Sequence, residues 1–473
     1  MGLGRTIGDT ARVPGRGLRR LAIVLVVLIG AAALGGTVAL GAPTVVAKLT
    51  GSSTIEAPPP PKLTLVGLPE TAPMPSAAAL AKQLEKPLDA IPGKVTGIVR
   101  DAVTGEVLWD HTSDRALVPG STGKLLTAAA ALLTLDSTRG LVTKVVAGKQ
   151  PGTVVLVGGG DPTLTALPEG KETVYPQPTR LVELARKVKA TVKEPITRVQ
   201  IDVSRYQGDR MAPGWDPADI QGGYIAPIQP LMLDGGRLDP TEQDGARTPA
   251  PARAAGQAFA ELLGVDGRQI TETVAEPGAK VLAAVTSAPI SELVEHTLRV
   301  SDNVLAEVLA HEVARARGAT PDFPSASREI LAALNQAGID TTGTQLYDGS
   351  GLSTKDRVSS RVLGAVLAAA AAPTENPNDP QFLRPLITGL PVAGGDGTLA
   401  TRFGPGERSA DGRGVVRAKT GTLTDVSSLA GVVTDADGRL LVFALMSNGG
   451  SPAAVRPRLD DLAAALAECG CRA

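Results

Sequence analysis

Three short groups of polar residues in this sequence could act together on a carbonyl carbon, and the first contains Ser121. Ser121 is the only serine that is followed by a lysine three residues later, Lys124. If a helix begins at Ser121, residues three apart lie on one face, so the lysine amine lies beside the serine hydroxyl. A lysine amine accepts a proton only when it is neutral, so burial or a nearby positive charge must lower its pKa. The spacing predicts a serine nucleophile with a lysine base.

The second group is Ser301-Asp302-Asn303, the only Ser-x-Asn in the sequence. A hydroxyl and an amide separated by one residue can point the same way from a short turn. We expect Ser301 to relay a proton and Asn303 to hold a substrate carbonyl.

The third group is Lys419-Thr420-Gly421-Thr422. On a strand the side chains alternate, so Lys419 and Gly421 share one face. Lys419, Thr420 and Thr422 could bind a terminal carboxylate, and Gly421 would let a substrate backbone lie close to the strand. Lys419 would also supply the positive charge that lowers the pKa of Lys124.

Each group taken alone also has a common structural explanation. Ser121 could cap a helix ahead of a surface lysine, and residues 301–303 could cap a helix over 304–312. Residues 419–422 could belong to an edge strand with solvated side chains. Only the three groups together favour a catalytic site.

The elements expected around these groups suggest one sheet closed by both ends of a globular body. Near its start, a helix over Ala77–Asp89 is followed by two strands with a turn at Thr104-Gly105. Near its end, three antiparallel strands are followed by a closing helix. The strands are expected at 94–100, 106–110, 414–422, 427–434 and 439–447, and the other helices at 124–135, 290–317 and 453–467.

Residues 141–285 differ from their surroundings. They hold short strands such as 154–157 and 198–203, one helix near 179–189, and long loops rich in proline and glycine. We therefore predict an inserted domain at 141–285 between the two parts of a catalytic domain, 76–140 and 286–473.

The N-terminal residues predict export. Five arginines precede an uncharged stretch from Leu21 to Ala47, which is longer than the 20 or so apolar residues that span a bilayer. A basic flank stays cytoplasmic, so residues 1–48 are expected to be a cytoplasmic tail with a membrane anchor, or a cleaved signal peptide. The proline-rich residues 49–75 predict an extended tether. The body is then extracytoplasmic, and it is secreted if the segment is cleaved.

Composition excludes several other classes of function. The 47 Lys+Arg nearly balance the 48 Asp+Glu, which argues against nucleic acid as the partner. With three histidines and two cysteines, Cys469 and Cys471, a metal site or a disulfide framework is not expected. His311-Glu312 lacks the second histidine of a zinc protease motif, because Arg315 stands in its place.

The three groups in this order resemble the motifs of penicillin-binding proteins and class A β-lactamases. The chain is most similar to the class C penicillin-binding proteins, the D-Ala-D-Ala carboxypeptidases and endopeptidases. The 180 residues from Ser121 to Ser301 leave room for the insertion of this class. Segments 157–164, 347–353 and 395–399 also look like that family. The resemblance implies an α+β fold of the penicillin-binding/β-lactamase-like type, an antiparallel sheet flanked by helices with an inserted domain.

The resemblance also implies acyl transfer on peptidoglycan stem peptides, without a cofactor or metal and with β-lactams as covalent inhibitors. Ser121 would attack the penultimate D-Ala, Lys124 would take its proton, and Ser301 would pass a proton to the leaving amine. Asn303 would hold the substrate amide. The N–H groups of Ser121 and of Thr422 in the third motif would form an oxyanion hole. Lys419 and Thr420 of that motif would bind the terminal carboxylate. The alternatives are a β-lactamase, although no Glu-x-x-Leu-Asn pentad follows residue 303, and an inactive cell-wall-binding module.

Overall fold

The structure is a computed structural model that describes residues 71–373 and 383–470. All of them belong to one compact unit, Leu68–Ala473. The predicted anchor or signal peptide at 1–48 and most of the predicted tether at 49–75 lie outside the described residues. Within the described ranges, no helix is both long and apolar enough to cross a bilayer.

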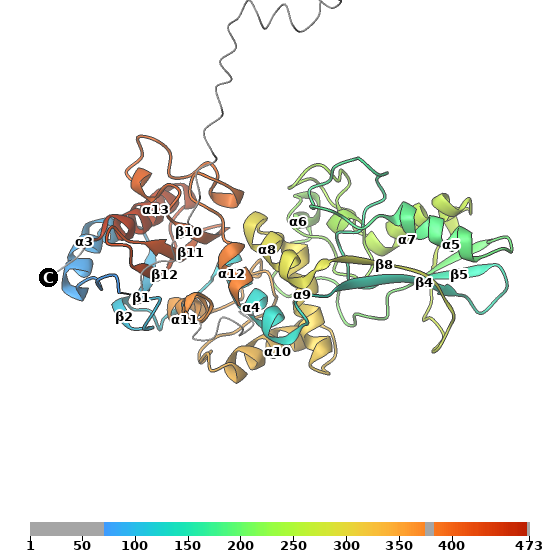
Figure 1. The fold of residues 1–473 in the computed structure, drawn as a ribbon, viewed down its shortest axis with the longest axis horizontal. Helices are drawn as coiled ribbons and strands as arrows, with labels where there is room; N and C mark the ends of the chain where they lie inside the picture. The colour runs from blue at the N-terminus through green and yellow to red at the C-terminus, as the bar shows by residue number, and fades with distance from the viewer. Residues whose placement is uncertain (1–70, 374–382, 471–473) are drawn as a thin grey trace, which may run out of the picture. The chain divides into compact units, whose positions relative to one another are not determined.

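The first layer is an antiparallel sheet with the strand order β10-β11-β12-β1-β2 (Figure 1). Strands β1 and β12 pair from Lys94↔Asn448 to Asp101↔Leu441, so the start and the end of the body meet in one sheet, as the sequence predicts. The strands are β1 (Lys94–Asp101), β2 (Val107–His111), β10 (Arg417–Leu423), β11 (Val426–Thr434) and β12 (Leu440–Asn448).

Both faces of this sheet are apolar, because successive strand residues point to opposite sides. On β12, Phe443 and Leu445 pack with α3 (Ala77–Asp89) and α13 (Pro452–Glu468). The alternate residues, such as Ala444, join a core with the central helices. The sheet is therefore buried between two layers of helices.

The central helices include α4, which is buried almost all round and follows the Ser121 segment. Strand β3 (Ala116–Leu117) precedes α4 in the chain and forms a short antiparallel pair with β9 (Val358–Ser359), which directly precedes α11. The other helices of this layer are α8 (Ile290–Val300), α9 (Asn303–Ala316), α10 (Phe323–Gln336), α11 (Ser360–Ala371) and α12 (Arg384–Thr388), with α4 at Lys124–Thr134.

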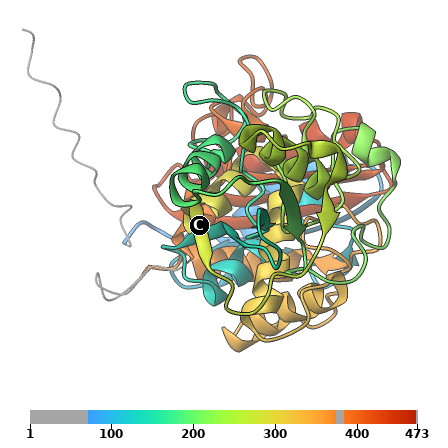
Figure 2. The same cartoon turned by 90° about the vertical axis from the view of Figure 1, so that its right-hand side faces the viewer.

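A second sheet is built from residues 140–289, the stretch in which an inserted domain is predicted. Its order is β7-β6-β5-β4-β8, and β4 and β8 form a long antiparallel ribbon that connects α4 with α8. Figure 2 faces this sheet and its helices, drawn in green. Its elements are β4 (Gly140–Ala147), β5 (Thr153–Val157), α5 (Leu181–Thr191), β6 (Arg198–Asp202), α6 (Ala218–Gln221), α7 (Pro251–Leu263), β7 (Thr271–Glu272) and β8 (Val281–Pro289).

The helical pattern expected over 290–317 is broken in the structure. Helix α8 ends at Val300, Ser301 adopts the left-handed conformation (φ 63°, ψ 38°), and α9 begins at Asn303. The Asp302 side chain accepts a hydrogen bond from the Leu305 N–H and so caps α9. Apolar periodicity continues through the break and did not reveal it, whereas the possible helix cap at residues 301–303 did indicate a helix start there.

Candidate active site

Ser121 lies in a turn of 3₁₀ helix, η1 (Gly120–Gly123), directly before α4. A 3₁₀ helix has three residues per turn, so residues three apart lie one above the other. The Lys124 Nζ is accordingly 3.0 Å from the Ser121 Oγ. The spacing argument from the sequence is confirmed, although the turn is 3₁₀ rather than α-helical.

The Lys124 amine is fully buried and has three acceptors around it. Besides Ser121 Oγ, these are Asn303 Oδ1 at 2.5 Å and the Ser350 carbonyl oxygen at 2.7 Å. A neutral amine has two N–H groups and one lone pair. It can donate to Asn303 and Ser350 and keep the lone pair for the Ser121 proton.

Burial lowers the pKa of Lys124 to about 8, against the charges of Asp348, Glu307 and Asp302, which act to raise it. The sequence analysis assigned this lowering to the charge of Lys419. In the structure burial is the main cause. The pKa of Lys419 is itself lowered, first by burial and then by the charge of Lys124.

The second motif lies at the break between α8 and α9 and meets both lysines. Ser301 Oγ accepts a hydrogen bond from Lys419 Nζ at 2.8 Å, and Asn303 Oδ1 accepts one from Lys124. The Asn303 Nδ2 donates to the Tyr224 carbonyl oxygen at 2.9 Å, which fixes the orientation of the amide. The helix-cap explanation is also correct, because Asp302 between them caps α9.

The third motif lies on β10, at the edge of the first sheet. Lys419 is fully buried, and burial together with the charge of Lys124 lowers its pKa well below the ordinary value. Its Nζ also donates to the Thr420 carbonyl oxygen at 2.8 Å. The Thr420 hydroxyl donates to Thr398 Oγ1 at 2.9 Å, which brings the 395–399 segment to the site.

Gly421 has a structural role that differs from the expected one. A Cβ at this position would lie 2.6 Å from the Pro119 carbonyl oxygen and 3.1 Å from the Ser121 nitrogen, and it would overlap Ser428 Oγ. The missing side chain thus lets the Ser121 turn pack directly on β10, so the segment that approaches Gly421 in the structure is the turn that carries Ser121.

The Thr422 N–H faces the open edge of β10. The Ala418 N–H donates outside the sheet, to Pro391 O, and strand N–H groups alternate between the two edges, so Thr422 presents its N–H on that same edge. The Ser121 N–H lies in the first turn of η1, where N–H groups have no partner within the helix. A Cβ on Gly120 would be 3.2 Å from the Thr422 nitrogen, so the two donors belong to adjacent segments.

The sequence analysis missed two residues that hold the Lys124 pocket together. Ser350 supplies a carbonyl acceptor for Lys124. Glu307, fully buried on α9, accepts hydrogen bonds from the Gly349 N–H at 2.9 Å and the Ser350 N–H at 2.7 Å. Glu307 could have been noticed as one acid within the apolar run 304–310. Ser350 belongs to the 347–353 segment, which resembled the family but had no role assigned.

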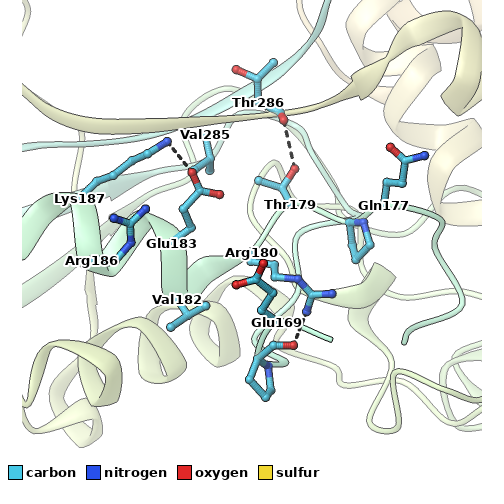
Figure 3. A pocket seen from close by; sticks show the side chains of 12 residues that line it. Glu169, Gln177, Thr179, Arg180, Val182, Glu183, Arg186, Lys187, Val285 and Thr286 are labelled. Atoms are coloured by element: carbon cyan, nitrogen blue, oxygen red, sulfur yellow. Dashed lines mark hydrogen bonds and ion pairs between the residues drawn. The ribbon is translucent and has the colours of Figure 1, made fainter. Parts of the chain in front are cut away.

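A separate hollow lies in the second sheet's part of the structure, beside α5 and β8 (Figure 3). Arg180 is tied to backbone carbonyls of the 167–171 loop, and Lys187 pairs with Glu183 at 2.8 Å. None of the eight predicted site residues lines it. Across the described part of the chain, no cluster of three or more His, Cys, Asp or Glu residues could hold a metal ion.

Two mycobacterial proteins are similar to this chain over most of their length. Carboxypeptidase Rv3627c of Mycobacterium tuberculosis is 45% identical, with 88% of this chain and 89% of the relative covered. Carboxypeptidase DacB of Mycolicibacterium smegmatis is 45% identical, with 85% and 87% covered. Among solved structures, penicillin binding protein 4 of Haemophilus influenzae shares the fold, with a TM-score of 0.66, 21% identity, and 80% of this chain and 97% of that chain covered.

The likeness to that solved structure confirms the predicted penicillin-binding fold class. The model of the D-Ala-D-Ala carboxypeptidase 3 (S13) family matches residues 76–247 and 241–469, which include all three motifs. The chain therefore belongs to the D-Ala-D-Ala carboxypeptidase 3 (S13) family.

Proposed function

We propose that this chain, a serine-type D-Ala-D-Ala carboxypeptidase, acts as a carboxypeptidase/endopeptidase on peptidoglycan stem peptides through an acyl intermediate on Ser121. The observation that carries the proposal is the contact between Lys124 Nζ and Ser121 Oγ, 3.0 Å apart. Membership of the family and the carboxypeptidase names of the two mycobacterial relatives support the reaction class.

In the first step the Ser121 oxygen attacks the carbonyl carbon of the penultimate D-Ala, and neutral Lys124 takes the hydroxyl proton. Burial already lowers the pKa of Lys124 to about 8, so little free energy is needed to deprotonate its amine at neutral pH and free the lone pair. The N–H groups of Ser121 and Thr422 would stabilise the oxyanion, each donor being worth roughly 10²–10³ in rate.

In the second step the C–N bond breaks and the leaving nitrogen needs a proton. Ser301 Oγ accepts a hydrogen bond from Lys419, so its own O–H is free to donate. Ser301 would give this proton to the nitrogen and take one from protonated Lys419, while the proton from Ser121 stays on Lys124. Asn303 has one N–H on Tyr224 O and a second one available for the substrate amide. Water then hydrolyses the acyl-enzyme and restores Ser121.

The terminal carboxylate would bind at Lys419 and Thr420. Lys419 has hydroxyl and carbonyl acceptors but no acidic partner within the described ranges, so a substrate carboxylate would be its counter-ion. A β-lactam carries a carboxylate next to a strained amide and would acylate Ser121 in the same way. The basic and apolar N-terminal residues support an extracytoplasmic, membrane-anchored enzyme, or a secreted one if that segment is cleaved.

The test compares the wild type with Ser121→Ala and with Ser137→Ala, whose side chain lies outside the site. We expect a labelled penicillin to attach to Ser121 in the wild type and in Ser137→Ala, and both to release D-Ala from acyl-D-Ala-D-Ala. Ser121→Ala should do neither. A label on another residue, or D-Ala release by Ser121→Ala, would refute the proposal. Products from cross-linked peptidoglycan, separated by mass spectrometry, decide whether the endopeptidase activity is present.

A further inference from the structure

A fully buried ion pair connects the second motif with the 141–285 segment. Asp302 Oδ2 accepts a hydrogen bond from Arg237 Nη2 at 3.0 Å, and both side chains are completely buried. We propose that Arg237 is a positioning residue for Ser301 and Asn303, so that the inserted segment orients part of the active site. This inference rests on the proposed function, because it assigns Arg237 a role in the same acyl transfer.

Asp302 is the fixed point between the two motif residues. Its Oδ1 caps α9 through the Leu305 N–H at 2.9 Å, and its Oδ2 also accepts from the Tyr175 hydroxyl at 3.0 Å. Burial acts to raise the pKa of Asp302, but the charges of Arg237 and Arg247 outweigh it and hold this pKa below its ordinary value. The carboxylate therefore stays charged, with both oxygens bound in fixed directions.

The backbone next to Asp302 is strained and must be held. Ser301 has φ 63°, a left-handed conformation that non-glycine residues rarely adopt without support from their surroundings. This conformation directs Ser301 Oγ to Lys419 and places Asn303 against Lys124. A shift of Asp302 would move both contacts together, because one residue separates the two motif side chains.

Arg237 is itself held by the 141–285 segment. Its Nη1 donates to Tyr175 Oη at 2.9 Å and to Asp234 O at 3.0 Å, and its Nε donates to Gln243 O at 3.1 Å. The guanidinium carbon also lies 5.0 Å from the centre of the Tyr175 ring. These contacts hold the planar guanidinium in one orientation. Its Nη2 therefore binds Asp302 Oδ2 from a fixed direction and fixes the position of that carboxylate.

A second contact from the same segment acts on the motif. The Tyr224 carbonyl oxygen accepts from Asn303 Nδ2 at 2.9 Å, so the amide oxygen faces Lys124. Residues 175, 224 and 237 thus all reach the second motif. The inserted segment contributes to the geometry of the centre although none of its residues was predicted to react.

The principal test is Arg237→Gln, compared with Arg402→Gln as a matched control. Arg402 forms a similarly buried ion pair with Asp460 of α13, and the side chains of this pair are hydrogen-bonded to each other and not to a motif residue. We expect Arg237→Gln to slow acylation by a labelled penicillin by about 10- to 100-fold, the range for a hydrogen bond to a charged group. Arg402→Gln should lower thermal stability but acylate at the wild-type rate below its unfolding temperature.

Two further variants cover the case in which Arg237→Gln does not fold. Tyr175→Phe removes one hydrogen bond to Asp302 without changing charge, and it should slow acylation by about 3- to 10-fold. The double variant Arg237→Gln/Asp302→Asn keeps a cap residue without an unpaired buried charge, so it should fold and recover part of the lost rate.

The readouts separate positioning from mere stability. We expect the loss in kcat, with KM for acyl-D-Ala-D-Ala changed less than twofold, because the carboxylate site at Lys419 is retained. Arg237→Gln or Tyr175→Phe acylating at the wild-type rate would overturn this inference and leave the proposed function intact. A wild type that no penicillin acylates at Ser121 would instead overturn the proposed function.

Discussion

The two lysines of the site are buried to the same degree but lie in opposite electrostatic surroundings. The acidic side chains of Asp348, Glu307 and Asp302 act to raise the pKa of Lys124. Burial and the charge of Asp348 raise the pKa of Glu307 itself to about 8, so the effect of Glu307 grows as it ionises. Among the described residues, the hydrogen-bond partners of Lys419 are hydroxyl and carbonyl oxygens, and the charge that acts on its pKa is that of Lys124. One side of the site can therefore keep a proton in the empty enzyme, whereas the other side needs an anion to do so.

This difference suggests how the site divides one proton between two lysines. In the empty site the proton favours Lys124, because three acidic side chains act to raise its pKa, whereas burial and the charge of Lys124 both lower the pKa of Lys419. A substrate carboxylate at Lys419 would stabilise the proton there instead. Lys124 would then be neutral when the substrate is bound, which is the state in which it can act as a base.

The largest effect is expected on the Lys124 side. Lys124→Ala should slow acylation by penicillin by about 10²–10⁴, the range for loss of a general base. Lys124→Arg should be nearly as damaging, because a guanidinium does not lose its proton at accessible pH. Stopped-flow acylation measures both, with Lys149→Ala, an exposed lysine paired with Glu276, as the control. Near-normal acylation by the arginine variant would rule out Lys124 as the base.

A smaller effect, which depends on the substrate, is expected on the Lys419 side. Lys419→Ala should lower kcat/KM for acyl-D-Ala-D-Ala by about 10- to 100-fold, as expected for the loss of a charged hydrogen bond. The same peptide with a C-terminal amide should react slowly with the wild type, and its kcat/KM should fall little further in the variant. If both peptides lose the same factor, Lys419 does not recognise the carboxylate.

The pH dependence should have opposite signs for these two peptides. The amidated peptide needs Lys124 to be neutral before binding, so its kcat/KM should rise with pH up to about 8, by about tenfold per unit. The carboxylate peptide needs one proton on the lysine pair, so its kcat/KM should fall above about pH 8. In Lys419→Met both peptides should follow the rising curve. Equal profiles in the wild type would contradict the shared proton.

The sequence was enough to single out candidate site residues that the structure brings together, because their pattern depends on residue type and short spacing. Each pair lies within one turn of the chain, so its sequence spacing alone makes it recognisable. The pairs are Ser121 with Lys124 and Ser301 with Asn303. The pairing of β1 with β12 was also predictable, since strand and helix patterns recur at both ends of the body.

The missing parts of the site are those that depend on contacts between distant segments or on the backbone. The acceptor that Ser350 offers to Lys124 is a carbonyl oxygen, which any residue type would supply. Arg237 and Asp302 are 65 residues apart, and no local pattern connects them. The packing of the Ser121 turn against Gly421 was missed for the same reason, because that turn lies some 300 residues earlier.

The smallest expected effect concerns the acids behind Lys124 and their influence on stability. Asp356 is buried, and one of its oxygens accepts from the Tyr347 N–H at 2.7 Å. Burial and the neighbouring charge of Asp348 raise the pKa of Asp356 to about 10, so this carboxyl stays protonated at neutral pH. In the unfolded chain it would ionise near pH 4.

Because the folded state holds this proton more tightly, the contribution of Asp356 to stability is fully present below about pH 4 and is lost as the pH rises towards 10. Asp356→Asn keeps an acceptor for Tyr347 and carries no titrating group. Urea unfolding should therefore show that the free energy of unfolding of the variant rises relative to that of the wild type between pH 5 and pH 8, by up to about 1.4 kcal/mol per pH unit. If the difference in stability between the two proteins is the same at both pH values, Asp356 ionises normally in the fold, and the acidic surroundings of Lys124 hold one more negative charge than the comparison of the two lysines assumes.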